Sequence, residues 1–196
     1  MFQVRVHGRG GQGVVTTAEL LSVAAFSEGR HAQAFPTFGS ERTGAPVVGF
    51  CRIDDRPIRT HEPVVRPDAV IIQDATLLHQ VDVFDGLAPD GYLLINTSRS
   101  LDDLGLDSFV RRFGRHRVMT VPATELAMKH LRKPLPGAVL LAAFAALTAQ
   151  IRLASVVAAI EERFPGHVAA GNVAAAEAAY ELVRSQIEEP ARAQTD

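Results

Sequence analysis

The chain has 196 residues, of which 47% are hydrophobic and 21% are charged, and its formal net charge is -2 at pH 7. This composition is typical of one well-buried globular domain, and an aromatic content of only 6% argues against nucleic acid as a partner. A single cysteine, Cys51, cannot form an internal disulfide or hold an iron–sulfur cluster, which needs about four thiolates.

No targeting or membrane segment is expected. The first residues enter a strand directly, and no uncharged run reaches the ~18 residues that a membrane-spanning helix requires. We therefore expect a cytoplasmic protein that does not act at a membrane.

The first predicted unit is a strand over residues 2–7, followed by a glycine-rich loop and a helix over residues 16–27. Gly8, Gly10 and Gly13 have the spacing G-x-G-x-x-G. A fourth glycine, Gly11, lies between the last two. We expect Gly8 to allow the turn off the strand and Gly13 to permit close packing of the helix on the sheet.

The remaining glycines and the helix end predict an anion site in this loop. Gly10 and Gly11 would let backbone N–H groups approach a bound group without interference from side chains. The helix that follows points its positive dipole end and its unpaired N–H groups at the same place.

A dinucleotide is the first ligand to consider for such a loop. That pattern requires an acidic residue roughly 20 positions further on, at the tip of the second strand, to hold a ribose. Here residues 31–36 read HAQAFP, without an acid. A free-standing oxidoreductase that binds NAD(P) or a flavin therefore remains only as the alternative hypothesis.

Further strands are predicted where apolar runs are bounded by turn residues, over residues 31–35, 47–53, 68–74, 92–96 and 116–121. Residues 57–61 are expected to return as the antiparallel partner of residues 47–53. Apolar faces at helical spacing predict a helix from about residue 122 and three more over residues 138–150, 155–164 and 169–187.

This order of elements predicts an α/β fold. We expect an open, mostly parallel, Rossmann-like sheet with an inserted antiparallel hairpin, helices on both faces and a helical C-terminal third. One domain should span residues 1–188, with residues 189–196 as a flexible tail.

Ligands of such sheets gather at the carboxyl ends of the strands. The glycine loop, the loop of residues 36–46, Asp74 and residues 96–98 should all meet at that edge. Asp74 could act as a base or ligand contact, or it could cap the next helix. Gln12 could bond to a ligand or neighbouring subunit, or only to its own backbone.

The loop of residues 36–46 offers further alternatives. Glu41 and Arg42 could hold an anion or cross an interface, or form a local ion pair. Phe38 could line a pocket, or anchor the loop to the core. The seven histidines do not cluster at metal-ligand spacing, and no catalytic group can be assembled from spacing, so we predict neither a metal site nor a catalytic residue.

The order of three motifs carries a family resemblance. GRGGQG follows a strand at residues 8–13, AFPTFGSERTGAPV follows at residues 34–47, and Gly171-Asn172 precedes the final helix. In this combination the chain resembles the gamma subunit of the pyruvate:ferredoxin oxidoreductase family, over nearly its whole length. The resemblance implies a contact loop, facing a ligand or partner, made by Gly8, Gly10, Gly11, Gln12, Gly13, Phe38, Gly39, Glu41 and Arg42.

The resemblance also implies a function and a set of partners. Such a complex oxidatively decarboxylates a 2-oxoacid to its acyl-CoA and passes electrons to ferredoxin or another acceptor. Thiamine diphosphate, Mg²⁺ and the iron–sulfur clusters would belong to alpha, beta and delta-type or fused subunits. The gamma chain would pack on these subunits and help to enclose CoA, the co-substrate, or the substrate channel.

One departure from the family pattern limits this transfer. Many relatives have Asn-Thr-Ala at the start of the antepenultimate helix, where this chain has Gly137-Ala138-Val139. A role that depends on that asparagine is therefore not carried over.

Overall fold

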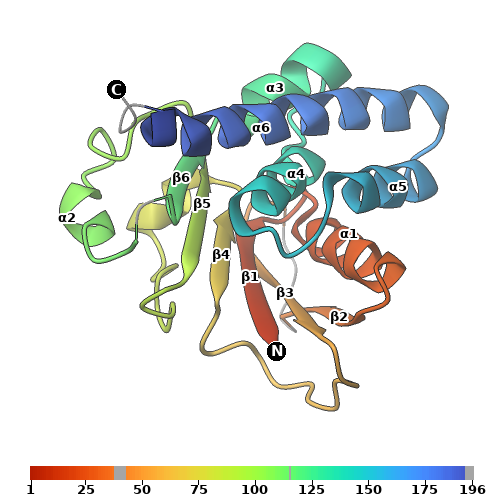
Figure 1. The fold of residues 1–196 in the computed structure, drawn as a ribbon, viewed down its shortest axis with the longest axis horizontal. Coiled ribbons are helices and arrows are strands. Elements are labelled where there is room, and N and C mark those ends of the chain that lie inside the picture. Colours follow the sequence, from red (N-terminus) through yellow and green to blue (C-terminus); the bar gives the residue numbers. More distant parts are fainter. Residues whose placement is uncertain (38–42, 115, 193–196) are drawn as a thin grey trace.

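Residues 1–37, 43–114 and 116–192 are described by the computed structural model, in which one six-stranded sheet is covered by helices (Figure 1). The strands are β1 (Phe2–Arg9), β2 (His31–Pro36), β3 (Pro46–Asp54), β4 (Ala69–Ile72), β5 (Tyr92–Asn96) and β6 (Val118–Val121). The helices are α1 (Val14–Ser27), the 3-10 helix η1 (Ala75–His79), α2 (Asp107–Val110), α3 (Ala123–Leu131), α4 (Gly137–Thr148), α5 (Leu153–Arg163) and α6 (Gly166–Arg192).

The strand directions confirm the predicted, mostly parallel sheet. Its order is β2-β3-β1-β4-β5-β6. The pairs β1–β4, β4–β5 and β5–β6 are parallel, whereas β3 is antiparallel to both β1 and β2. The inserted antiparallel pair is therefore β2 with β3, and β3 separates β2 from β1.

The expected partner of β3 is corrected, because residues 57–61 form no strand. Both edges of β3 already bond to neighbouring strands, so no backbone groups remain for a third partner. A side chain holds the segment in place instead, since the Arg52 guanidinium donates to the carbonyl oxygens of Thr60 and Glu62.

Two hydrophobic clusters lie on opposite faces of the sheet. On one face, Val6 and Ile71 pack with residues of α1, α4, α5 and α6. On the other face, Ile72 and its neighbours pack with Leu77 of η1 and with the segment that leads to α2. The prediction of helices on both faces is confirmed, and the helices of the second face are short.

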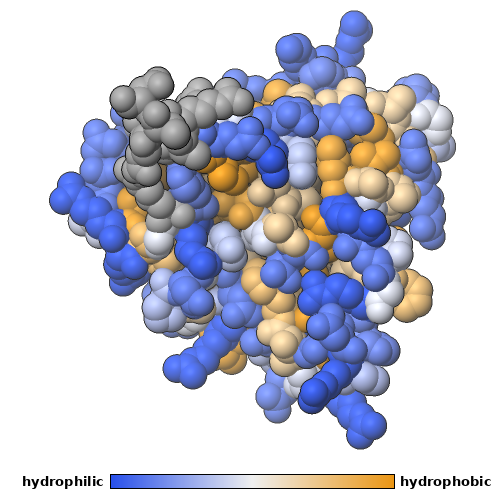
Figure 2. Space-filling view, viewed as in Figure 1, coloured by the Kyte–Doolittle hydropathy of each residue, from blue (hydrophilic) through white to orange (hydrophobic). Residues whose placement is uncertain are grey.

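The predicted helical C-terminal third is also confirmed. Ten of the 12 residues of α4 are buried, as expected for a helix that is apolar all round. α4 contacts both the sheet and α6, and α5 packs beside α1 (Figure 1). Figure 2 shows that polar side chains cover much of the outer surface on this side, with apolar residues grouped between them.

Gly171 and Asn172 lie inside α6. This agrees with the helix predicted over residues 169–187 and corrects the placement of the motif before the final helix. A Cβ atom at Gly171 would come within 3.1 Å of the His130 carbonyl oxygen and 3.0 Å of Leu131 Cδ1. Glycine here therefore lets α6 approach the end of α3 closely. Among the described residues, no helix is both long enough and apolar enough to cross a bilayer.

His7 is a titratable side chain within the core. It is 6% exposed, and its Nε2 has no hydrogen-bond partner among the described residues. Burial, together with the positive charge of Arg5, lowers the His7 pKa to about 4. The folded chain therefore keeps this imidazole neutral at pH values where the unfolded chain protonates it.

Acidification is expected to lower the free energy of unfolding through His7. Between the ordinary pKa of 6.5 and the folded value of about 4, the unfolded state binds a proton that the native state does not. From about pH 7 to about pH 4.5 this removes about 2–3 kcal/mol of stability. Urea unfolding at the two pH values measures this change in the free energy of unfolding. The loss on acidification should be smaller by that amount in His7→Leu than in the wild-type chain, and equal losses in the two proteins would contradict the assignment.

Candidate functional site

The glycine loop joins β1 to α1 at the carboxyl edge of the sheet. Gly11 has a φ of 93°, and Gly13, the N-cap of α1, has a φ of 76°. Both angles lie in the left-handed region, which side chains with a Cβ rarely adopt. The path of the backbone therefore strongly favours glycine at these two positions.

The expected roles of Gly8 and Gly13 are corrected by this geometry. Gly8 lies within β1, and a Cβ atom built there would come 2.5 Å from Val14 Cγ2. Gly8 therefore permits the close packing of α1 on the sheet, whereas Gly13 permits the turn. The two predicted reasons are therefore exchanged: close packing applies to Gly8, and the turn applies to Gly13.

Gly8→Ala is expected to lower the free energy of unfolding by about 1–3 kcal/mol, the cost of overpacking a filled core. The added methyl group would displace Val14 at the start of α1. Chemical denaturation measures the change. Gly49→Ala, where the nearest atom is 3.2 Å from the new Cβ, should cost less, and the reverse order would contradict this packing argument.

Arg9 organises the loop from its centre. Its Nε bonds to Asp74 Oδ2 at 3.0 Å, and its Nη1 donates to the Gly44 carbonyl oxygen at 3.0 Å. Its Nη2 donates to Thr76 Oγ1 at 2.6 Å and to Gln80 Oε1 at 2.9 Å. This guanidinium therefore joins three segments that are far apart in the sequence.

Gln12 and Asp74 meet, as the sequence predicts for groups at this edge. Gln12 Oε1 accepts from the Arg9 backbone N–H at 2.8 Å, and Gln12 Nε2 donates to Asp74 Oδ2 at 2.9 Å. Gln12 thus caps its own loop and also reaches across to the neighbouring strand.

Asp74 is the acceptor that this cluster shares. It caps η1 by accepting from the Thr76 N–H at 3.0 Å. Burial raises the pKa of the Asp74 carboxyl, but hydrogen bonds from Thr76 and Gln12 and the charge of Arg9 outweigh this, so its pKa is lowered. The carboxylate is ionised at neutral pH and works as a cap and an ion-pair partner.

The second sequence motif lies directly on the glycine loop. The Gly10 N–H donates to the Ala45 carbonyl oxygen at 2.9 Å, and the Gly44 N–H donates to the Gly10 carbonyl oxygen at 3.0 Å. The described end of the AFPTFGSERTGAPV motif is therefore fixed to the glycine loop. The predicted residues Phe38, Gly39, Glu41 and Arg42 lie outside the described residues.

Asn96 takes part in a separate polar chain under the same edge. Its Nδ2 donates to the Gln73 carbonyl oxygen at 2.8 Å and to Thr124 Oγ1 at 2.7 Å. Gln73 Nε2 in turn donates to Thr17 Oγ1 at 2.7 Å. These hydrogen bonds hold the starts of α1 and α3 on the sheet, and among the described residues none of them joins the Arg9 cluster.

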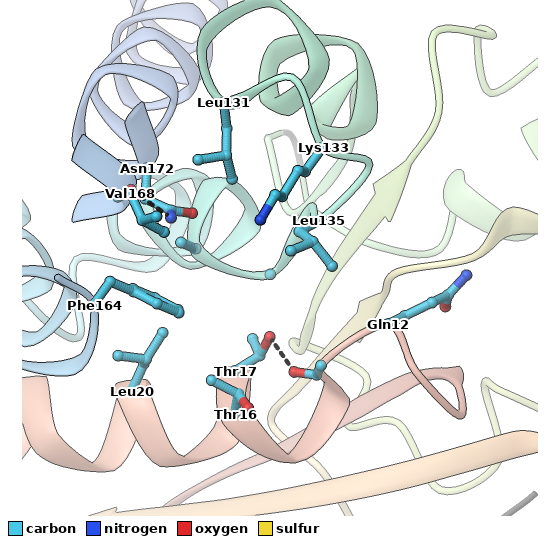
Figure 3. Close-up of a pocket in the computed structure, with 13 residues that line it drawn as sticks. Gln12, Thr16, Thr17, Leu20, Leu131, Lys133, Leu135, Phe164, Val168 and Asn172 are labelled. Atoms are coloured by element: carbon cyan, nitrogen blue, oxygen red, sulfur yellow. Dashed lines mark hydrogen bonds between the residues drawn. The ribbon is translucent and has the colours of Figure 1, made fainter. Parts of the chain in front are cut away.

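Two hollows border the glycine loop. One, of about 290 Å³, is lined by Gly10, Gly11 and Gly13 together with Val47. The other, also about 290 Å³, lies between α1, the α3–α4 link and α6. Gly13 is among its lining residues, and Gln12 lies at its edge (Figure 3).

Three residues of this region were not predicted as site residues. They are Arg9, Lys133 and Asn172. The position of Arg9 between glycines of the loop was the sequence pattern that could have indicated its role. For Asn172 the Gly171-Asn172 motif was the available signal, and for Lys133 no local pattern distinguishes a cavity wall from an ordinary helix end.

Comparison with known proteins agrees with the motifs. The sequence profile of the family described as pyruvate ferredoxin/flavodoxin oxidoreductase matches residues 3–182. Pyruvate synthase subunit PorC of Methanosarcina barkeri is 48% identical over 95% of this chain and 99% of that relative. The pyruvate/ketoisovalerate oxidoreductases common subunit gamma of Thermococcus kodakarensis is 43% identical over 92% of this chain and 96% of its own length.

A solved structure agrees with the fold as well. The crystal structure of pyruvate oxidoreductase subunit PORC from Thermotoga maritima superposes with a TM-score of 0.77 at 34% identity, over 92% of this chain and 95% of that one. The profile, the relatives and this structure agree over nearly the whole length of the chain. The chain therefore belongs to the pyruvate ferredoxin/flavodoxin oxidoreductase family, among its gamma-type subunits.

Proposed function

We propose that this chain is the gamma subunit of a 2-oxoacid:acceptor oxidoreductase that converts a 2-oxoacid such as pyruvate to an acyl-CoA. The observation that supports this most is the 48% identity to a pyruvate synthase subunit across 99% of that subunit's length. Electrons would leave for ferredoxin or another acceptor, and the complex would work in the cytoplasm.

The residues of this chain do not fit the redox cofactors of such a complex. Its one cysteine, Cys51, is buried in β3, and burial raises the pKa of its thiol. In the part of the chain that the structure describes, no three His, Cys, Asp or Glu side chains are placed to hold a metal. We assign thiamine diphosphate, Mg²⁺ and the iron–sulfur clusters to alpha, beta and delta-type or fused subunits.

The glycine loop is proposed as the surface that faces a partner or a ligand. Arg9, Gln12 and Asp74 fix the loop by bonds among themselves, so the loop is rigid before anything binds. Gly10 and Gly11 line a hollow, and Gly11, whose Cβ position has no described neighbour within 4 Å, leaves room for close approach. Phe38, Gly39, Glu41 and Arg42 are proposed to contact the same partner or ligand, and CoA is the ligand that this chain would help to enclose.

The alternative of a free-standing dinucleotide enzyme is not favoured. In a dinucleotide-binding fold the strand that carries the ribose acid lies beside the first strand. Here β3 lies between β1 and β2, so the tip of β2 is two strand positions, roughly 10 Å, from β1. The Gly10 N–H is also already bonded to Ala45.

Native purification of the tagged chain tests the subunit assignment. Mass spectrometry of everything that co-elutes, with assays for thiamine diphosphate and iron, should find large partner subunits that carry both. A chain that elutes alone or as a homomer with a bound nucleotide would contradict the proposal and favour the dinucleotide alternative.

A further inference from the structure

The cavity between α1, the α3–α4 link and α6 has two unlike ends. Its volume of about 290 Å³ is just below the range for pockets of drug-sized ligands, roughly 300–1,000 Å³, so a small ligand is expected. Most of its wall is apolar and comes from Leu20, Leu131, Leu135, Ala138, Phe164 and Val168. In Figure 3, Leu20, Phe164 and Val168 lie together at one end.

A cation lies at the opposite part of the cavity. Lys133 extends from the α3–α4 link with its ammonium group directed inward, between Leu131 and Leu135 (Figure 3). It forms no ion pair with any described residue.

The start of α1 adds a positive dipole end to the same region. Gly13 caps the helix without a side-chain hydrogen bond, and the first turn contains no acidic residue. Thr16 and Thr17 of that turn line the cavity. Both the ammonium group and the helix N-terminus therefore stabilise a negative charge at this end of the cavity.

Asn172 contributes a buried polar group to the wall. It is 4% exposed, and its Nδ2 donates back to the Val168 carbonyl oxygen at 2.9 Å. Its Oδ1 has no hydrogen-bond partner among the described residues, and Figure 3 shows the carboxamide at the cavity. This amide oxygen is free to accept a hydrogen bond from a ligand hydroxyl or from a bound water.

We infer that this cavity binds a small monocarboxylate with an apolar tail. The carboxylate takes the end near Lys133 and the start of α1, and the tail packs among Leu20, Phe164 and Val168. One ammonium group and one helix terminus suit a single negative charge. The inference rests on the cavity and holds whether or not the proposed function does.

Calorimetric titration of the full-length chain with 4-methylpentanoate tests the inference, with 4-methylpentanamide as the uncharged probe. The carboxylate should bind and the amide should bind at least about tenfold more weakly, since a charge-assisted hydrogen bond is lost. Lys133→Met should weaken carboxylate binding by about tenfold, and Lys133→Arg should retain most of it.

The chain provides a matched control, because its other lysine, Lys129 of α3, does not line the cavity. Lys129→Met should leave carboxylate binding unchanged. Val168→Phe, which fills the apolar end, should weaken both probes. Equal binding of the two probes, no effect of Lys133→Met, or no binding by a chain that circular dichroism shows to be folded would each overturn the inference.

Discussion

Asp74→Ala is expected to lower the free energy of unfolding by about 2–3 kcal/mol, because it leaves the partly buried Arg9 guanidinium without its charged partner. The two side chains are only 16% and 21% exposed, so water replaces the carboxylate poorly. The change also removes the cap of η1 and the acceptor of Gln12. Chemical denaturation at neutral pH measures the loss.

A double-mutant cycle separates the ion pair from the other effects of this change. Arg9→Met, Asp74→Asn and the double variant should give a coupling energy of about 1–3 kcal/mol, as expected for residues in one network. Asp102→Ala, at an exposed loop carboxylate, is the control and should change stability by less than about 0.5 kcal/mol. A coupling energy near zero would show that Arg9 does not organise the loop.

Gly11→Asp is expected to reduce assembly of the complex, or its acyl-CoA formation, by about tenfold or more. Among the described residues, and apart from the two chain neighbours of Gly11, no atom lies within 4 Å of a Cβ built at Gly11, so that Cβ meets no described neighbour. The proposed partner or anionic ligand would meet it, and would then face a negative charge of its own sign.

Gly11→Asn is the matched control for this prediction. Asparagine has the same shape as aspartate and also tolerates the left-handed region, so both variants share the backbone cost at φ 93°. Only the charge differs between them. Co-elution with partner subunits and turnover with a 2-oxoacid should be clearly better for Asn than for Asp, and equal values would remove the proposed role of the loop.

The sequence predicted the sheet because its strands are short apolar runs bounded by turn residues. It failed at residues 57–61, where composition permits a strand but both edges of β3 are taken. The sequence predicted that positions 8 and 13 need glycine. It did not predict that Gly8 serves the packing of α1 and Gly13 serves the turn. Packing between Gly8 and Val14 depends on how the helix approaches the sheet.

The candidate site was predictable where sheet topology alone brings residues together. Asp74 and Gln12 follow neighbouring parallel strands, so their meeting could be expected. Arg9 binds groups 35 to 71 positions away in the sequence, and no local pattern encodes such contacts. Lys133 and Asn172 come together only because α6 folds back over the end of α3.

Reconstitution tests the subunit assignment most directly. The native complex would be prepared with and without this chain, and 2-oxoacid- and CoA-dependent reduction of ferredoxin would be measured in both. We expect the complex that lacks the chain to lose this activity and to regain it when the purified chain is added. Full activity without the chain, or no recovery when the folded chain has rejoined the complex, would contradict the account.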